Sequence, residues 1–235
     1  MKQELDAEAE RIRTEYERRE RELTPDFYAL HRPANLFLRH GQERALVAAL
    51  RRAGMLPLAE RRILEIGCGR GQWLVTFEEL DARRENLAGI ELDWERAQFC
   101  AARFTGADIR QGNAAEVPWP DATFDIVFQS TVFTSILQPE MKAAVAREML
   151  RVAKPDGRIV WYDFMFDNPK NSAVRAIKRA ELSQLFPNCR IDARRVTLAP
   201  PLARRIVPIS WLAAEMLESL RVLNTHLMCV IQRAS

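Results

Sequence analysis

The stretch that decides the fold runs from Ile63 to Trp73 and reads Ile-Leu-Glu-Ile-Gly-Cys-Gly-Arg-Gly-Gln-Trp. A short apolar run that carries one carboxylate is followed by three glycines at alternate positions and by the start of an amphipathic segment. Glycine adopts positive φ and lets a ligand approach the main chain. The amides of a helix N-terminus offer donors to a polar or anionic group. The stretch predicts a strand, a tight turn and a helix start, either around a ligand or as a turn without one.

The spacing of the glycines separates two kinds of nucleotide loop. They occupy positions 67, 69 and 71, whereas a dinucleotide fingerprint requires Gly-x-Gly-x-x-Gly. The position that the fingerprint would fill with its third glycine is Gln72. The pattern therefore argues against a nicotinamide-dependent enzyme.

Strands and helices alternate on both sides of this loop. The expected helices cover 72–80, 94–104 and 139–152, and the expected strands cover 63–66, 87–92, 108–111, 124–129 and 158–162. Alternation of this length is typical of a parallel sheet with right-handed crossovers. The fold class is therefore α/β, with helices on both faces of the sheet.

The pattern weakens after residue 165. We expect a loop over 168–171, a helix over 172–186 and two further strands, over 190–198 and 227–233. With these two, the sheet has seven strands and is mostly parallel. The intervening segment, 200–223, is apolar but carries Arg204 and Arg205.

The N-terminal part of the chain reads as helical. Residues 2–23 hold eight acidic and six basic side chains, with opposite charges three or four positions apart, which is typical of a solvated helix. Residues 44–55 form an amphipathic pattern that ends at Gly54 and Pro57. We therefore divide the chain into a helical extension, 1–60, and a core, 61–235.

Composition excludes several classes of function. The 235 residues are 48% apolar and 29% charged with a net charge of +3, which suits one α/β domain and gives no case for DNA binding and little for RNA binding. The four cysteines are scattered, so neither a disulfide framework nor a zinc site is expected, and a cytoplasmic location fits. We find no signal peptide and no apolar run long enough to span a bilayer.

Ligands of open α/β sheets bind outside the carboxyl ends of the strands. The polar residues expected there include Glu91 after the second strand, Asn113 after the third, Gln129 after the fourth and Asp163 after the fifth. Each could instead have a purely structural role, as a surface carboxylate, a turn residue or a loop cap. Occurring together and in this order, they favour a nucleotide-type site.

The stretch from Glu65 to Gly71 resembles the nucleotide loop of class I S-adenosylmethionine (SAM)-dependent methyltransferases, whose fold is Rossmann-like. The resemblance extends over about 63–163 and includes Leu150–Gly157, the approach to the fifth strand. The chain is also similar to bacterial methyltransferases of unassigned substrate. The resemblance implies SAM as the cofactor, the extension 1–60 as a lid, and 164–226 as the acceptor side.

The resemblance also implies roles for individual residues. Glu65 would hold the cofactor's amino group, and Glu91 the ribose hydroxyls. Gly67, Gly69 and Gly71 would let the backbone pass close to the methionine part and the ribose. Leu92 and Ala114 would pack against the adenine, which Asn113 would contact. Gln129 would lie near the methionine part.

Candidates for catalysis are fewer. His31 and Tyr28 lie in the expected lid, and Asp163 ends the fifth strand, although helix packing or a loop cap would also account for these residue types. The segment after the fourth strand begins with Gln129 and Ser130 and lacks the carboxylate that a metal-dependent site requires, so we expect no metal.

The acceptor is the least determined part. We expect a small-molecule or glycan-like acceptor, methylated at oxygen. The stretch Lys170–Arg205 holds nine basic and two acidic residues, which would suit an anionic acceptor or an anionic membrane surface, or would simply be solvated. A binding or regulatory protein without turnover, and an RNA or protein methyltransferase, remain alternatives. The sequence does not indicate an oligomeric state.

Overall fold

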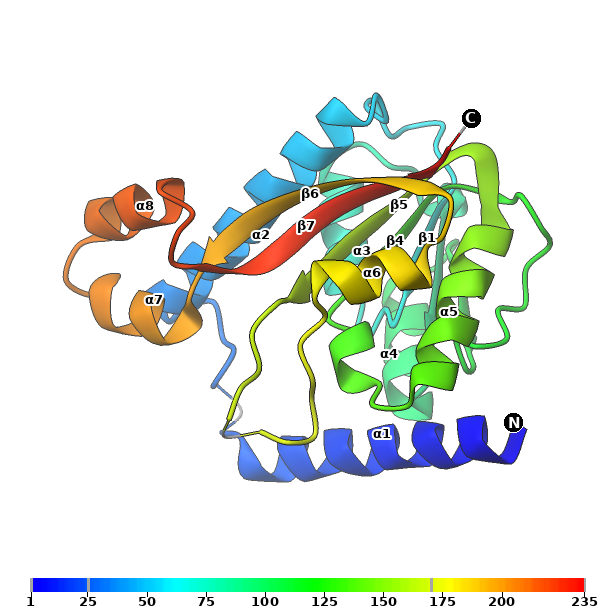
Figure 1. Ribbon diagram of the computed structural model, residues 1–235, viewed down its shortest axis with the longest axis horizontal. Coiled ribbons are helices and arrows are strands. Elements are labelled where there is room, and N and C mark those ends of the chain that lie inside the picture. The colour runs from blue at the N-terminus through cyan, green and yellow to red at the C-terminus, as the bar shows by residue number, and fades with distance from the viewer. Residues whose placement is uncertain (1, 25, 170, 235) are drawn as a thin grey trace.

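Seven strands form one twisted sheet in the order β3-β2-β1-β4-β5-β7-β6 (Figure 1). The computed structural model describes residues 2–24, 26–169 and 171–234. Lys170, the first residue of the basic stretch, therefore lies outside the described residues. The strands are β1 (Ile63–Ile66), β2 (Leu87–Glu91), β3 (Asp108–Gln111), β4 (Phe124–Ser130), β5 (Ala153–Phe164), β6 (Cys189–Leu198) and β7 (Asn224–Arg233).

The first five strands run parallel, β7 is antiparallel to its neighbours β5 and β6, and β6 therefore runs in the same direction as the first five. Strand β1 lies between β2 and β4, so the chain reverses its direction of progress through the sheet at β1. In doubly wound sheets, this reversal opens a crevice at the carboxyl ends of the strands. The predicted α/β class and the mostly parallel seven-stranded sheet are confirmed.

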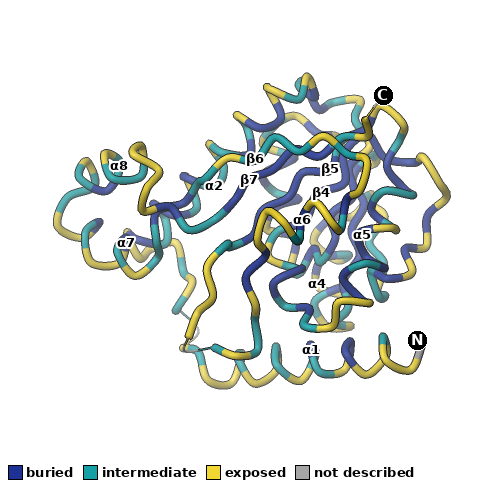
Figure 2. The backbone as a smooth tube through the Cα atoms, in the orientation of Figure 1, coloured by how far each residue is buried: buried dark blue, intermediate teal, exposed yellow. Residues whose placement is uncertain are grey.

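Helices cover both faces of the sheet. They are α1 (Lys2–Glu22), α2 (Pro33–Arg52), α3 (Gln72–Glu79), α4 (Trp94–Arg103), α5 (Pro139–Val152), α6 (Arg179–Leu185), α7 (Pro200–Ile206) and α8 (Trp211–Ser219), with short 3-10 turns at Arg84–Asn86 and Phe133–Ser135. Side chains of α5 and α6 pack in one core cluster, and those of α2, α3 and α4 pack in another on the opposite face. The central strands are buried on both sides, as Figure 2 shows.

Local sequence signals fix several helix starts. Asp93 caps α4, its side chain accepting a hydrogen bond from the Arg96 amide at 2.9 Å. Proline occupies the first turn of α5 at Pro139 and of α7 at Pro200, where its missing amide hydrogen costs nothing. These signals begin each helix close to the end of the preceding strand or loop.

Helix α1 crosses the N-terminal ends of α4 and α5 (Figure 1). Glu8, 3% exposed, accepts hydrogen bonds from the amides of Leu137 and Gln138 at the start of α5. At the other end of α1, Glu20 pairs with Arg96 at 2.6 Å. A carboxylate at a helix N-terminus interacts favourably with the helix dipole. These contacts hold α1 beside the carboxyl edge of the sheet.

Helices α7 and α8 project as a lobe from one end of the molecule (Figure 1). The lobe connects Leu198, the end of β6, to Asn224, the start of β7. Because β7 begins where β5 ends, with His226 opposite Phe164, the lobe stands at the carboxyl edge of the parallel strands. Its inner side packs on the first half of α2.

The predicted helix over 172–186 is too long. Only Arg179–Leu185 is helical. The preceding amides bond elsewhere: Arg175 donates to the Thr134 carbonyl at 2.8 Å, and Ile177 to the Phe164 carbonyl at 3.1 Å. Partners distant in sequence therefore replace the helical hydrogen bonds, which a local pattern cannot reveal.

Among the described helices, none combines the length and the apolar character needed to cross a membrane.

Candidate functional site at the carboxyl edge of the sheet

Most of the predicted cofactor residues lie along one edge of the sheet. The glycine loop follows β1, Glu91 ends β2, and Asn113 follows β3. Gln129 lies near the end of β4, opposite Ile66 of β1. The parallel register brings these segments side by side, so one ligand can contact them all.

The three loop glycines all have positive φ, but their surroundings differ. A Cβ at Gly67 would lie 2.6 Å from Cγ2 of Val132, and one at Gly71 would overlap the ring of Phe104. A Cβ at Gly69 would meet no atom within 4 Å. Gly67 and Gly71 therefore allow the protein to pack on the loop, whereas Gly69 borders open space where a ligand can pass.

Glu91 braces the glycine loop. One oxygen accepts from the amide of Gly69 at 2.8 Å, and the other accepts from the amide of Asp93 at 3.0 Å. The side chain is buried. A carboxylate accepts about four hydrogen bonds, so each oxygen retains capacity for a ligand hydroxyl. Glu91 thus fixes the loop and can also bind a vicinal diol.

Glu65 is a buried carboxyl group with an unsatisfied oxygen. It is 2% exposed, and among the described residues its Oε2 has no hydrogen-bond partner. Burial, together with the nearby Cys100 and Glu91, raises the pKa of Glu65 well above its usual value. A buried carboxyl oxygen normally has a hydrogen-bond donor or a cation as its partner. Glu65 lies directly before the loop, where a cationic group of a ligand would provide both the hydrogen bond and the opposite charge.

The predicted adenine side consists of Leu92, Asn113 and Ala114. Leu92 and Ala114 are partly buried against the core cluster to which α1 contributes Ala9 and Ile12. The Asn113 Oδ1 accepts from the Ala115 amide at 2.9 Å, so its side-chain amide group remains as the donor toward a base. Binding of an adenine ring at these residues stays a prediction.

Gln129 connects two strands. It is fully buried; its Oε1 accepts from the Val132 amide at 3.0 Å, and its Nε2 donates to the Tyr162 carbonyl at 3.3 Å. It therefore positions the loop after β4. Its predicted proximity to the methionine part of the cofactor stays a prediction.

The predicted catalytic residues do not form one cluster. Tyr28 and His31 are exposed on the connection between α1 and α2, and the Tyr28 hydroxyl accepts from Arg19 at 2.9 Å. Asp163 is 1% exposed at the end of β5. The catalytic roles of all three stay predictions.

Asp163 has an unusual environment. The Thr134 hydroxyl donates to it at 2.6 Å, and the amides of Thr134 and Phe164 also donate to it. Burial raises the pKa of Asp163 to about 7, and these donors only partly oppose that effect. A carboxyl group with this pKa exchanges its proton near neutral pH.

A second polar group at this edge was not predicted from the sequence. The His226 ring stacks on Tyr162 with centroids 5.0 Å apart, and the Tyr162 hydroxyl bonds Gln42 and Thr197. Burial lowers the pKa of His226 to about 4, so the ring is neutral at pH 7. The antiparallel register of β5 and β7 creates this group, and no local pattern encodes that register.

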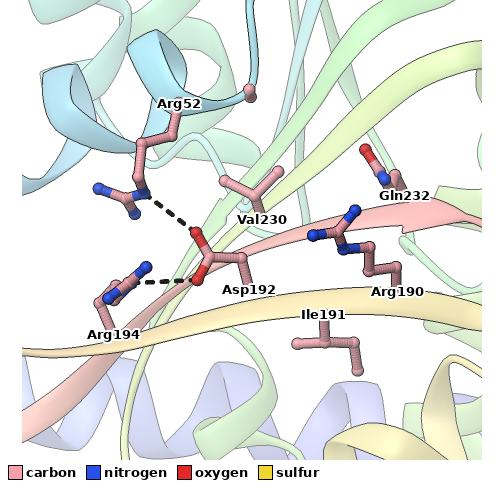
Figure 3. Close-up of a pocket in the computed structure, with 8 residues that line it drawn as sticks. Arg52, Arg190, Ile191, Asp192, Arg194, Val230 and Gln232 are labelled. Carbon is pink, nitrogen blue, oxygen red and sulfur yellow. Dashed lines mark hydrogen bonds and ion pairs between the residues drawn. The ribbon is translucent and has the colours of Figure 1, made fainter.

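A cavity of about 340 Å³ lies away from this edge, between the end of α2 and strands β6 and β7 (Figure 3). Arg52 and Arg194 both bond Asp192 within it, each at 3.0 Å. Val230 and Gln232, which line it, lie near the end of β7, far along the strand from His226. Within the described residues, no three His, Cys, Asp or Glu side chains gather as metal ligands.

The site can be tested for its fit to SAM, the cofactor implied by the resemblance. Glu65 offers an unsatisfied buried oxygen to the amino group, Gly69 leaves the space in which the methionine and ribose pass, and Glu91 retains acceptor capacity for the ribose hydroxyls. The residues present fit the group.

Comparisons with known proteins agree with this geometry. Residues 64–161 match a methyltransferase domain. The chain is 33% identical over 122 residues to the 27-O-demethylrifamycin SV methyltransferase of Amycolatopsis mediterranei, covering 49% of this chain and 43% of the relative. It is 35% identical over 136 residues to a probable S-adenosylmethionine-dependent methyltransferase of Mycolicibacterium smegmatis, covering 54% and 51%.

The fold has solved relatives. A SAM-dependent methyltransferase from Aquifex aeolicus superposes with a TM-score of 0.58 at 14% identity, covering 89% of this chain and 99% of the other. The chain spans about half the length of the curated relatives it matches. Over residues 64–161 the chain is therefore similar to methyltransferase domains, and its strand order and glycine loop agree with the resemblance to class I S-adenosylmethionine-dependent methyltransferases.

Proposed function

We propose that this protein transfers a methyl group from SAM to an oxygen atom of a small-molecule or glycan-like acceptor. The observation that carries the proposal is the pair of buried carboxyl groups around the glycine loop. Glu91 holds the Gly69 amide, and Glu65 has an oxygen without a partner. One cofactor with an ammonium group, a diol and a long flexible chain would satisfy both.

Glu65 would bind the amino group of the cofactor. Its pKa is raised in the unliganded protein because its charge is buried. An ammonium group within a few ångströms favours the ionised carboxylate and reverses that shift. Glu91 would accept from the ribose hydroxyls while retaining its bonds to the amides of Gly69 and Asp93.

The chemistry required of the protein is limited. SAM supplies a methyl group already activated on a sulfonium. The chain must hold the acceptor oxygen in line with that methyl group, at about 3–3.5 Å, and exclude water. Helices α1 and α2 would act as the lid, because α1 is fixed across the starts of α4 and α5 by Glu8 and Glu20.

A proton must leave the acceptor when the nucleophile is a hydroxyl. Asp163 is the base we propose, because its pKa of about 7 suits proton transfer at neutral pH and because β5 ends at the same carboxyl edge as the glycine loop. Its burial means that the Thr134 contact must open before an acceptor can reach it. His31 and Tyr28, on the connection between α1 and α2, are proposed to act from the lid.

Transfer to oxygen is supported by one of the curated relatives. The name of the Amycolatopsis protein describes methylation at O-27 of a demethylrifamycin. The neutral His226 ring, stacked on buried Tyr162 at the same carboxyl edge, adds no charge there and is compatible with an uncharged hydroxylated acceptor. An RNA acceptor is not favoured, because the chain as a whole carries a net charge of only +3.

The proposal can be tested by incubating the protein with SAM and a panel of hydroxylated small molecules and glycans, and measuring release of the demethylated cofactor. We expect acceptor-dependent release that Asp163→Asn reduces at least tenfold without weakening SAM binding. Release that requires protein or RNA acceptors would contradict the acceptor class. SAM binding with no turnover on any acceptor would favour the regulatory alternative.

A further inference from the structure

One face of the projecting lobe is apolar and exposed. Leu212, Met216 and Leu220 follow one another at intervals of four residues along α8 and its C-terminal end, and they are 66%, 63% and 67% exposed. Ile209 before the helix and Val222 after it are 85% and 71% exposed. These five residues are called the outer stripe below. Within the part of the chain that the structure describes, nothing covers them.

The outer stripe is not needed to hold the lobe together. The opposite side of α8 does that: Ala214 is fully buried, and Trp211 packs edge-on against Phe37 of α2, with ring centroids 5.2 Å apart. A surface helix normally exposes polar residues on its outer face. Contiguous exposed apolar side chains on a soluble domain mark a binding surface.

The charges around the outer stripe are mainly positive. Arg204 and Arg205 at the end of α7, and Arg221 after α8, are all exposed. Of the two acidic residues of α8, Glu218 pairs with Arg44 at 2.8 Å, whereas Glu215 accepts from the Trp211 indole at 3.1 Å and keeps its negative charge, which the three arginines outnumber. Arg204 lies over the Phe27 ring, 4.8 Å from its centroid, whereas Arg205 and Arg221 have no ion-pair partner among the described residues. Exposed apolar side chains near such arginines are complementary to a surface with an apolar interior and anionic head groups.

The shape of the lobe favours a flat partner. It projects beyond the sheet at one end of the molecule, with exposed residues on its outside (Figure 2). A second copy in a symmetric contact would face the same arginines, and like charges across an interface oppose association. A projecting apolar stripe with a basic rim is suited instead to insertion into the boundary between lipid head groups and acyl chains.

We propose that the outer stripe docks this protein reversibly onto an anionic phospholipid bilayer. The apolar side chains enter the interface, and Arg205 and Arg221 contact lipid phosphates. Because the lobe stands at the carboxyl edge of the sheet, docking presents this edge to the membrane. The inference does not depend on the proposed methyl transfer, since neither cofactor nor acceptor takes part in docking.

The test is co-sedimentation of the full chain with vesicles, without cofactor or acceptor. Vesicles of phosphatidylcholine with phosphatidylglycerol should retain the wild-type protein, vesicles of phosphatidylcholine alone should retain much less, and added salt should release it. The triple variant Leu212→Ser, Met216→Ser, Leu220→Ser should bind anionic vesicles at least tenfold more weakly. Arg205→Gln with Arg221→Gln should weaken binding to anionic vesicles specifically.

Phe99→Ser is the matched control, because Phe99 is also exposed, at 47%, but lies on α4. It should bind vesicles like the wild type. Thermal unfolding of each variant checks that the fold is retained. Three results would overturn the proposal: a wild-type protein that stays in the supernatant with anionic vesicles, a triple variant that binds them as strongly as the wild type, or a wild-type dimer that the triple variant converts to a monomer.

Discussion

The carboxyl edge around the glycine loop and the α7–α8 lobe are built in opposite ways. At the loop, charged side chains are buried and hold main-chain amides, as Glu91 holds Gly69. In the lobe, large apolar side chains such as Leu212 and Met216 are exposed to solvent. Charged groups, which are usually exposed, are buried at the loop. Large apolar groups, which are usually buried, are exposed in the lobe.

Both reversals cost stability in the free protein, and binding of a ligand or partner can offset that cost. A buried carboxyl group loses hydration, and an exposed leucine retains the unfavourable hydration that burial would remove. The comparison therefore separates a rigid site, built from backbone and buried charge, from an adaptable surface built from side chains. Substitutions should have large effects in the first region and small effects on stability in the second.

The largest effect is expected at Glu91. Glu91→Ala removes the charged acceptor of two amides and of the proposed ribose contacts, at a cost of about 4 kcal/mol in SAM binding, or roughly a thousandfold. The thermal stabilisation that SAM gives to the wild type should therefore disappear at the same ligand concentration. Glu91→Gln, which keeps one acceptor oxygen, should retain part of it. An equal thermal shift in all three proteins would show that Glu91 does not bind the cofactor.

The second-largest effect is expected at Gly71, which differs from Gly69 in the same loop. At Gly71, φ is +81° and a Cβ would overlap Phe104, so Gly71→Ala should lower the free energy of unfolding by about 3 kcal/mol. At Gly69, φ is +54° but the space is open, so Gly69→Ala should cost only about 1 kcal/mol. Urea unfolding measures both. The reverse order would mean that the loop packs differently.

The third effect concerns Asp163, between the two regions. Because its pKa is about 7 in the folded protein and near 3.8 when unfolded, the folded state binds the extra proton between these values. The stability contributed by the protonated form is therefore present at low pH and lost as pH rises toward 7. From pH 5 to pH 8 the wild type should lose roughly 2.5 kcal/mol relative to Asp163→Asn.

His226, whose pKa is lowered to about 4, has the opposite dependence, with stability gained as pH rises from 4 toward 6.5. It is present in both proteins, so it cancels in the difference between their unfolding curves. Parallel curves for wild type and Asp163→Asn would show that Asp163 is ionised in the folded state throughout this range.

The smallest effect is expected in the lobe. Met216→Ser removes an exposed side chain and should change the free energy of unfolding by less than about 0.5 kcal/mol. Val207→Ala, which removes two methyl groups from the buried side of the same lobe, should cost about 1–2 kcal/mol. Chemical denaturation of both variants compares the two sides. A Met216→Ser cost as large as that of Val207→Ala would mean that the outer stripe is covered in solution.

The sequence predicted the loop region well for a physical reason. Three glycines at alternate positions, a strand before them and a carboxylate one strand later constrain the backbone directly, so position in the chain determines position in space. The Glu91 bond to Gly69 follows from that geometry. What the sequence did not reveal is that two of the glycines, Gly67 and Gly71, serve protein packing.

The acceptor side was predicted less well because distant contacts determine it. The Tyr162–His226 stack depends on the register of two antiparallel strands, and the short α6 depends on amides that bond Thr134 and Phe164. The apolar character of 200–223 was visible in the sequence, but the sequence could not say which side of α8 would remain exposed.

We propose that the cofactor binds in the space beside Gly69, between Glu65 and Glu91. Isothermal titration of the wild type and of Gly69→Arg with SAM and with its demethylated product tests it most directly. Gly69→Arg fills the open space, whereas Gly54→Arg, also at positive φ in open space but at the end of α2, is the matched control. The account predicts binding of both ligands by the wild type and by Gly54→Arg, and none by Gly69→Arg. Absence of binding to the wild type, or equal affinity in Gly69→Arg, would contradict it.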